Sequence, residues 1–419
     1  MPHTPQTAVV RLLQGCTDAR NIAPGERIEV RPHLVILGPR DGLAALKSYL
    51  LAGGEPIADP DRVVLFSDEN LPAADAAAAN RSKQLTEAAA QAGIKRVIPA
   101  AGCELAHVIE HALVVPGELA VGSLPDIHQL GGLGALGLRV TISDLASLLA
   151  GKPLSLTVPA AVRVDLTGHR QALVSGRDVF FTLRREVTRD RLVGRALEIG
   201  GEGLATLSLD DRIALCGQAA HAGLAAVFCP PDRAAVAELN KRIARPYTTV
   251  EPEKEATWVH SASLELSHAQ LSVVPPEGIE HWRTVGEASG EPISRVVIGG
   301  GLNALKQAAE IIKLRRKNPG VECAVVPATR ESYRRALEQD VLEQLLEAGV
   351  RVHAPGTPAA ALLEGKPGLV TGLTAPAGCW RGGVITAATA ACAGAIVHPE
   401  RLDAQPQRDS KLSGRRPKA

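Results

Sequence analysis

The chain has 419 residues, which is enough for two to four domains, and its 46 basic and 45 acidic side chains leave a net charge of +1. A balance this even argues against an extended nucleic-acid or membrane-surface footprint. Aromatic residues make up only 2% of the chain, which leaves little material for base-stacking platforms. We therefore expect small molecules or proteins as partners, with no nucleic acid and no membrane.

The cysteines and the N-terminus bear on the compartment. The seven cysteines are widely scattered, and no two are spaced as Cys-x-x-Cys, which is typical of a reduced cytoplasmic protein. The first residues, MPHTPQTAVVRLLQG, lack a basic segment followed by a long apolar core. No apolar run approaches the roughly 20 residues of a membrane span. We expect neither a signal peptide nor a transmembrane segment.

Short apolar runs alternate with Ala-rich stretches in the first part of the chain. Residues 33–38, 62–66 and 95–100 are predicted strands, and residues 72–93 are a predicted helix. This alternation is typical of layered α/β domains with largely parallel sheets.

Two further regions follow. The second opens with strand-like residues 158–168 and ends in a helical pattern over 208–228, and residues 245–257 read as a charged, Pro-containing linker. From 258 onward strands and helices alternate again. We predict domains at 1–157, 158–250 and 251–400, followed by a disordered basic tail at 401–419.

Five segments resemble one known family in the same order. They are VVLFSDENLPAADAAAAN (63–80), VVPGELAVGSLPDIHQLGGLGALG (114–137), GRALEIGGEGLATLSLDDRIAL (194–215), SLELSHAQLSVVPP (263–276) and RVVIGGGLNALKQAAEII (295–312). They are similar to the Asp-His, Gly-Ala-Leu-Gly, Leu-Ser-x-x-x-Arg, Asp-Leu-Ser-x-Leu-x-Pro and Ile-Gly-Ser-Cys-Thr-Asn stretches of aconitases and isopropylmalate isomerase large subunits. The resemblance covers roughly residues 15–400.

The resemblance implies an α/β, aconitase-like fold. Three α/β/α three-layer domains would surround a central cleft, and the fourth, swivelling domain would be absent from this chain. In the resembling isomerases that domain is a separate small chain that completes the active site. A small swivel-domain-like subunit is therefore a candidate partner.

The resemblance also identifies substitutions at a metal site. Where the resembling enzymes place three cysteine ligands of a [4Fe-4S] cluster, this sequence has Gly301, Thr357 and Ala360. Such clusters need thiolates at fixed positions. Neither Cys323 nor Cys379 falls at one of them. We therefore expect no cofactor, and in particular no [4Fe-4S] cluster.

The catalytic side chains of the resembling enzymes differ here as well. Their Asp-His pair becomes Asp68 and Glu69, and a glutamate of their second domain becomes His221. Their Asp-Ser-His-Thr motif aligns with residues 124–127, which removes its serine and histidine. The sequence predicts the fold of this family without its side-chain chemistry.

The densest polar cluster is CELAHVIEH, residues 103–111. On a helix, His107 and His111 would share one face, a spacing able to hold one metal ion. The pattern His-x-x-Glu-His is also the inverted zincin motif. Three interpretations stay open: two ordinary histidines on a half-exposed helix, a metal site, or acid-base work by His107.

Two pairs of residues are acid-base candidates. Asp126 and His128 lie on the loop that faces the substrate in the resembling enzymes, where a carboxylate and an imidazole can move a proton. Asp68 and Glu69 come directly after a strand, where α/β proteins place functional groups. The alternatives are a polar turn for the first pair and a helix N-terminal charge pair for the second.

The glycine-rich segment is the candidate anion site. Gly299, Gly300 and Gly301, with Asn303 as a helix cap, would offer free backbone N–H groups at a helix start, although packing alone also explains glycines there. Arg381 is a candidate for pairing with a carboxylate. His221 completes the candidate substrate-binding residues, with an ordinary interior histidine as the alternative.

Three functions remain open at this point. The first is a cluster-independent lyase or isomerase, hydro-lyase-like, that acts on a small carboxylate in the cleft by acid-base chemistry. The second is a non-catalytic homologue that binds a metabolite or a partner subunit. The third is a lyase or hydrolase built on a mononuclear metal held by His107, His111 and a third ligand.

Overall fold

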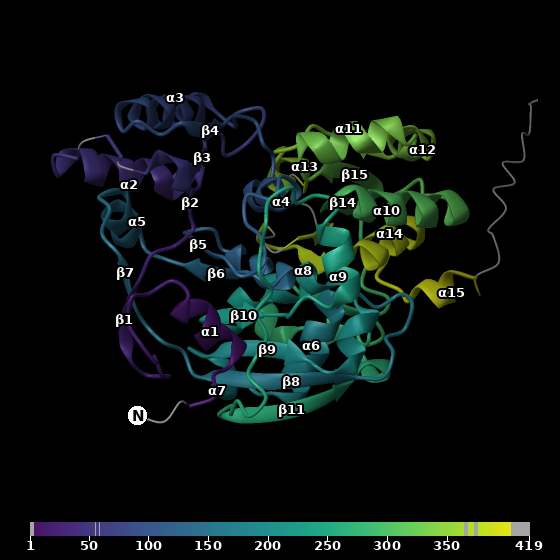
Figure 1. Cartoon of the computed structure of the whole chain (residues 1–419). Coiled ribbons are helices and arrows are strands. Elements are labelled where there is room, and N and C mark those ends of the chain that lie inside the picture. The colour runs from purple at the N-terminus through teal and green to yellow at the C-terminus, as the bar shows by residue number, and fades with distance from the viewer. Residues whose placement is uncertain (1–3, 55, 58, 364–367, 373–375, 404–419) are drawn as a thin grey trace, which may run out of the picture.

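The computed structural model describes residues 4–403 except 55, 58, 364–367 and 373–375. Its strands form three large sheets and one two-stranded sheet, in which β1 (Arg27–Val30) runs antiparallel to β7 (Leu154–Thr157). Figure 1 shows helices packed around the large sheets. The predicted α/β class is confirmed. In the described part of the chain, no helix is long and apolar enough to cross a membrane.

The first sheet is wholly parallel and has the strand order β4-β3-β2-β5-β6. Its order reverses between β2 and β5, which makes that point the topological switch point. β2, β3 and β5 are buried along their whole length, and apart from Phe66 and Gly122 they consist of Val, Leu, Ile and Ala. The strands and helices are β2 (Leu34–Leu37), α2 (Pro39–Leu51), β3 (Val63–Phe66), α3 (Ala76–Gln91), β4 (Arg96–Ile98), α4 (Glu104–Glu110), β5 (Leu119–Gly122), β6 (Leu136–Arg139) and α5 (Ile142–Leu149).

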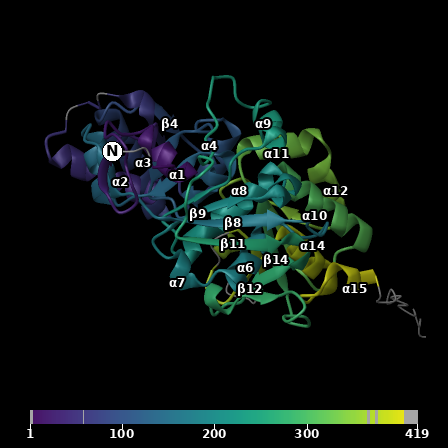
Figure 2. The same ribbon diagram turned by 60° about the horizontal axis from the view of Figure 1, so that its bottom comes forward.

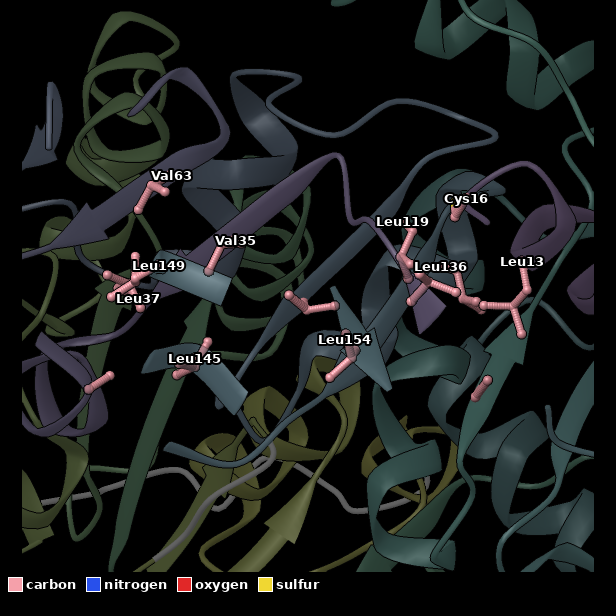
Figure 3. Close-up of a cluster of buried hydrophobic side chains, with 14 of the residues drawn as sticks. Leu13, Cys16, Val35, Leu37, Val63, Leu119, Leu136, Leu145, Leu149 and Leu154 are labelled. Carbon is pink, nitrogen blue, oxygen red and sulfur yellow. The ribbon is translucent and has the colours of Figure 1, made fainter. Parts of the chain in front are cut away.

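The core of this unit joins the sheet to the N-terminal helix α1 (Ala8–Gln14). Leu13 packs in the same buried cluster as Val35, Leu119 and Leu136, and Leu154 of β7 extends it (Figure 3). Each such side chain contributes about 1.5–3 kcal/mol when fully buried. The cluster fixes the sheet from which the candidate site described below is built.

The second sheet is also parallel, in the order β10-β9-β8-β11, and Figure 2 shows β9, β8 and β11 side by side. Because β11 pairs with β8, the predicted domain boundary at 250 does not separate the sheets. The helix predicted over 208–228 is also wrong in its second half, which is a 3-10 turn at 218–222 followed by a strand. The elements are β8 (Ala161–Thr167), α6 (Gly176–Glu186), α7 (Arg189–Leu192), β9 (Ala196–Gly200), α8 (Leu209–Gly217), β10 (Ala226–Phe228), α9 (Arg233–Leu239) and β11 (His260–Glu265).

The third sheet has the order β13-β12-β18-β17-β14-β15-β16, with antiparallel pairing only at the β13-β12-β18 edge. The predicted tail begins in a helix, because 401–403 belong to α15, and residues 404–419 lie outside the described residues. The elements are β12 (Ser272–Val274), β13 (Arg283–Thr284), β14 (Arg295–Gly300), α10 (Leu302–Arg315), β15 (Glu322–Pro327), α11 (Arg330–Glu338), α12 (Val341–Glu347), β16 (Arg351–Val352), α13 (Ala359–Leu363), β17 (Gly368–Thr371), β18 (Trp380–Gly382), α14 (Val384–Ala393) and α15 (Pro399–Asp403).

Candidate functional site

Ionisable side chains gather at the carboxyl edge of the first sheet. Arg40 follows β2, Glu69 follows β3, Glu104 begins α4 after β4, and Asp126 follows β5. In open parallel sheets, ligands bind at this edge, beside the switch point. The topology therefore places the candidate site here.

Asp68 and Glu69 have different surroundings. One carboxylate oxygen of Asp68 accepts hydrogen bonds from the hydroxyl of Ser67 at 2.7 Å and from the backbone N–H of Ala100 at 2.9 Å. Asp68 therefore connects the loop after β3 to the loop after β4. Glu69 forms ion pairs with Arg40 and with Arg81, the latter at 3.6 Å.

Within this cluster, Glu104 and Asp126 have pKa values that are raised toward neutrality. Burial raises the pKa of Glu104 to about 7; the negative charges of Asp126 and Glu69 add to the shift, and Arg40 opposes it. Burial raises the pKa of Asp126 to about 6. The side-chain amide of Gln129 donates to Asp126 at 3.0 Å. Near neutral pH such a pair holds a proton that it can give or take.

Cys103 precedes Glu104 and lies in the same electrostatic environment. Burial raises the pKa of its thiol, and the negative charges of Asp126 and Glu104 raise it further. In the absence of a metal ion Cys103 therefore stays a thiol at neutral pH, and it is not a nucleophilic thiolate.

The third sheet turns its own carboxyl edge toward this site. The backbone N–H of Cys103 donates to the carbonyl of Ala328 at 2.7 Å, and the N–H of Ala328 donates to the carbonyl of Gly300 at 2.8 Å. The N–H of Leu71 likewise donates to the carbonyl of Gly356 at 3.0 Å. In Figure 1, α4 lies between the strands of the first sheet and β15. Two successive hydrogen bonds, both made by Ala328, thus connect Gly300 of the glycine-rich segment to Cys103 at the start of α4.

The glycine-rich segment differs from its predicted form. The N–H of Gly299 is not free, because it donates to the hydroxyl of Thr371 at 2.7 Å, and that hydroxyl donates back to the carbonyl of Gly299 at 2.8 Å. Asn303 is not the cap: α10 begins at Leu302 after Gly301. The side chain of Asn303 instead donates at 2.7 Å to Asp210, near the start of α8. This bond joins the second sheet's unit to the third.

His107 and His111 lie together without a third metal ligand. Their ring centroids are 4.1 Å apart, and His107 meets Phe66 edge-on at 5.6 Å. Burial and the neighbouring His111 lower the pKa of His107 to about 4. Across the described ranges, no group of three or more His, Cys, Asp or Glu side chains is placed to hold a metal ion.

The other predicted residues lie at packed contacts. His128 is only 4% exposed, within the 3-10 turn Ile127–Leu133, and faces the carbonyl groups of Leu224 and Ala225. His221 lies in the 3-10 turn at 218–222. Arg381 in β18 is half-buried, burial lowers its pKa, and its carbonyl accepts a hydrogen bond from Arg177 at 3.2 Å.

Sequence reasoning missed three members of the cluster. Arg40, Cys103 and Glu104 each come directly after a strand of the first sheet or within a few residues of its end. Position after a strand is the signal that pointed to Asp68, and the same criterion would have found them. The raised pKa of Glu104 has no such signal, because it comes first from burial in the folded chain and then from the negative charge of Asp126.

Three layered α/β sheets, two of them with carboxyl edges facing one cluster of ionisable groups, define an aconitase-like α/β protein. The chain belongs to the Aconitase family (aconitate hydratase), whose sequence model matches residues 57–273. The resemblance inferred from the sequence segments is therefore confirmed.

Relatives along the whole chain agree with this assignment. The 3-isopropylmalate dehydratase large subunit 2 of Rubrobacter xylanophilus is 30% identical over 97% of this chain and 100% of its own length. The 3-isopropylmalate dehydratase large subunit of Heliobacterium modesticaldum is 26% identical over 95% and 99%. The holo-form of aconitase X from Thermococcus kodakaraensis has a similar fold, with a TM-score of 0.51 and 13% identity over 95% of this chain and 96% of that one.

The comparisons contradict the expected absence of a cofactor. The chain belongs to the family whose resemblance implied a [4Fe-4S] cluster, and the solved protein of similar fold is a holo-form. The prediction that no cofactor is used is wrong on these findings. It rested on three aligned positions and considered only Cys323 and Cys379 among the seven cysteines elsewhere in the chain.

The described residues nevertheless provide no ligand set for a cluster. Cys216 and Cys229, whose sulfurs are 3.5 Å apart, are the only two cysteines of the described chain for which a sulfur–sulfur contact is found. At an aligned cluster position, the hydroxyl of Thr357 donates to the carbonyl of Ala354 at 2.8 Å. These residues therefore do not fit a metal cluster that is held by cysteine thiolates.

Proposed function

We propose that the chain is a lyase or isomerase of the dehydratase type that acts on a small carboxylate. The names of its relatives, 3-isopropylmalate dehydratase large subunits, support this class of reaction. The observation that carries the proposal is the pair of carboxyls, Glu104 and Asp126, with pKa values raised toward neutrality at the carboxyl edge of the first sheet.

The two carboxyls take different roles in this proposal. Glu104 has the higher pKa, so it holds the proton and gives it to the departing hydroxyl group as general acid. Asp126 has the lower pKa and, when ionised, accepts the proton from the carbon next to the substrate's carboxylate. Dehydration is complete when both transfers have occurred, and the reverse order adds water.

Binding of the substrate carboxylate is assigned to the cationic and N–H groups around the pair. Arg40 lies at the carboxyl edge of the first sheet and forms an ion pair with Glu69. A substrate carboxylate can replace Glu69 as the partner of this guanidinium. The start of α10 at Gly301 lies across the site, and a side chain added at Gly301 would meet only the hydroxyl of Ser332, at 4.0 Å. That open space suits a small anion at a helix start.

Two further parts of the proposal concern partner and compartment. The relatives are named large subunits, which supports a small-subunit partner for this chain as well. None of the seven cysteines, all within the described part of the chain, forms a disulfide, and a reducing compartment such as the cytoplasm keeps thiols in that state.

The proposal is tested by assaying hydration and dehydration of 3-isopropylmalate and related hydroxy diacids. The chain is assayed alone and with an added isopropylmalate dehydratase small subunit. Glu104→Gln and Asp126→Asn should each lower kcat by about 10²–10⁴-fold with folding intact. Glu87→Gln, on the exposed face of α3, is the matched control and should leave turnover unchanged. Equal activity in all three variants would remove the acid-base assignment.

A further inference from the structure

Two adjoining hollows lie at the opposite, amino edge of the first sheet. The larger has a volume of about 540 Å³ and is lined by Arg27, Arg31, His33 and Arg62, among others. The smaller, about 310 Å³, shares His33 and Arg62 and adds two arginines, Arg96 and Arg245, and two carboxylates, Asp61 and Glu118. Since His33 precedes β2 and Arg62 precedes β3, neither hollow belongs to the candidate site at the carboxyl edge.

The larger hollow has more positive than negative groups available to a ligand. Arg27 donates to the hydroxyl of Ser155 at 2.8 Å, and Arg31 donates to the carbonyl of Gly151 at 3.4 Å, so each spends one nitrogen on a neutral acceptor. Among the described residues, neither guanidinium forms an ion pair with a carboxylate. Their charge is therefore not neutralised by the protein.

Arg62 and two acidic groups complete the charge of the larger hollow. Arg62 uses its Nε on Asp59, at 2.7 Å, which leaves its terminal nitrogens for another acceptor. Asp18 and Glu29 are the two carboxylates that line the same hollow. Three guanidiniums and two carboxylates therefore line the hollow, and Asp59, outside the lining, pairs with Arg62.

His33 supplies a neutral donor to both hollows. Its Nδ1 accepts the backbone N–H of Leu119 at 3.1 Å, which assigns its hydrogen to Nε2. Burial lowers the pKa of His33, with Arg62 and Arg245 acting in the same direction and Glu118 against them. At neutral pH the ring is therefore an uncharged N–H donor.

We propose that these hollows bind a small molecule that carries a phosphate group. Guanidinium groups pair bidentately with phosphate oxygens, and an imidazole N–H adds a further donor. Four side chains can donate hydrogen bonds here: Arg27, Arg31, Arg62 and His33. A carboxylate has two oxygens to accept these hydrogen bonds, whereas a phosphate group presents three, so phosphate matches the donors better. The volume also lies within the roughly 300–1,000 Å³ typical of ligand pockets.

An occupant of this site would contact the strands that lead to the candidate site. His33 immediately precedes β2, and its imidazole holds the first N–H of β5. These are the two strands that flank the switch point. The phosphate site is thus on the same sheet as the carboxyl pair, at the other end of its central strands.

Calorimetric titration of the full chain with inorganic pyrophosphate tests the proposal. One pyrophosphate should bind per chain, and Arg62→Ala and Arg31→Ala should each weaken binding by about tenfold. Arg335→Ala, an exposed arginine on α11, is the matched control and should change the Kd by less than about twofold. No binding, or equal weakening by the control, overturns the proposal.

Two further titrations test where the anion binds and which anion the hollows prefer. Asp126→Asn should leave pyrophosphate binding unchanged; if it changes the affinity, the anion binds at the candidate site and the proposal is wrong. Tricarballylate, a tricarboxylate, should bind more weakly than pyrophosphate. Tighter binding of tricarballylate overturns the assignment to phosphate.

Discussion

At the residue scale, Glu104 links the protonation of the site to the stability of the fold. Its pKa rises from 4.5 in a free side chain to about 7 in the folded protein. Between these values the folded chain binds more protons than the unfolded chain, so the free energy of unfolding falls as pH rises. The stabilisation is fully present below about pH 4.5 and is lost by about pH 7.

We predict that Glu104→Gln flattens this pH dependence. Between pH 5 and pH 8 the wild-type chain should lose roughly 2 kcal/mol of unfolding free energy at this group, allowing for partial solvent screening. Urea unfolding at both pH values measures the loss. Glu87→Gln, on the surface of α3, should keep the wild-type slope. A Glu104→Gln slope equal to that of wild type contradicts the shift.

His107 should show the opposite pH dependence. Burial and His111 lower its pKa from 6.5 to about 4, so between these values the unfolded chain binds more protons. The free energy of unfolding should then fall as pH decreases from about 6.5 to about 4. His107→Phe, which keeps a ring against Phe66, should remove about 1–2 kcal/mol of this acid sensitivity in urea titrations. The exposed His268→Gln variant should leave it in place.

The sequence indicated the position of these groups better than their properties. Asp68 was found because it follows a predicted strand, and Asp126 because the family resemblance places it on the substrate-facing loop; the structure places both after strands of the first sheet, at its carboxyl edge. His128 follows the same strand as Asp126, but the chain turns into a 3-10 helix there and buries it against the second sheet's unit. Local sequence does not encode that contact.

At the element scale, α4 is held at both ends by the third sheet. Cys103 before the helix bonds to Ala328, and Glu110 at its end accepts hydrogen bonds at 2.5 Å from the hydroxyls of Thr329 and Ser332. Thr329 is also the N-cap of α11, so a carboxylate at that point is favoured by the helix dipole. Glu110 thereby fixes the helix that carries Glu104.

Removal of this carboxylate should be costly. Glu110→Ala removes the shared acceptor of two buried hydroxyls, which as donors then keep only their 2.9 Å hydrogen bond to each other, and we expect this to lower the free energy of unfolding by about 1–3 kcal/mol. Urea unfolding measures the change, and Glu343→Ala on the exposed face of α12 is the control, expected within about 0.5 kcal/mol of wild type. Equal stability of the two variants would show that Glu110 does not hold α4.

Elements with strong local signals were predicted closely, and elements that depend on distant partners were not. The strand predicted at 62–66 is β3, and the helix predicted at 72–93 is α3, which starts after its N-cap Asp75. By contrast β11 is a half-exposed edge strand, and only its pairing with β8 assigns it to the second sheet. A division of the sequence at its linker therefore misplaced it.

At the scale of the whole molecule, glycines set how closely the first two sheets approach. The segment HQLGGLGALG runs through the turn between β5 and β6 into the start of β6, against the second sheet's unit. A side chain added at Gly131 would have its Cβ 2.2 Å from the carbonyl oxygen of Val227. The carbonyl of Gly131 also accepts the N–H of Cys229 at 3.0 Å, so the two backbones are bonded where they touch.

Gly131→Ala should therefore separate the first sheet from the second. Because the atom in the way belongs to the backbone of β10, no side chain can turn aside, and we expect a loss of at least about 3 kcal/mol or failure to fold. Gly286→Ala is the matched control, since its nearest neighbour is the hydroxyl of Thr284 at 3.8 Å, and it should change stability by less than about 1 kcal/mol. Urea midpoints and yield of folded protein measure both. Comparable stability of the two variants would mean that the sheets can part without cost, and that the positions of Glu104 and Asp126 do not depend on this contact.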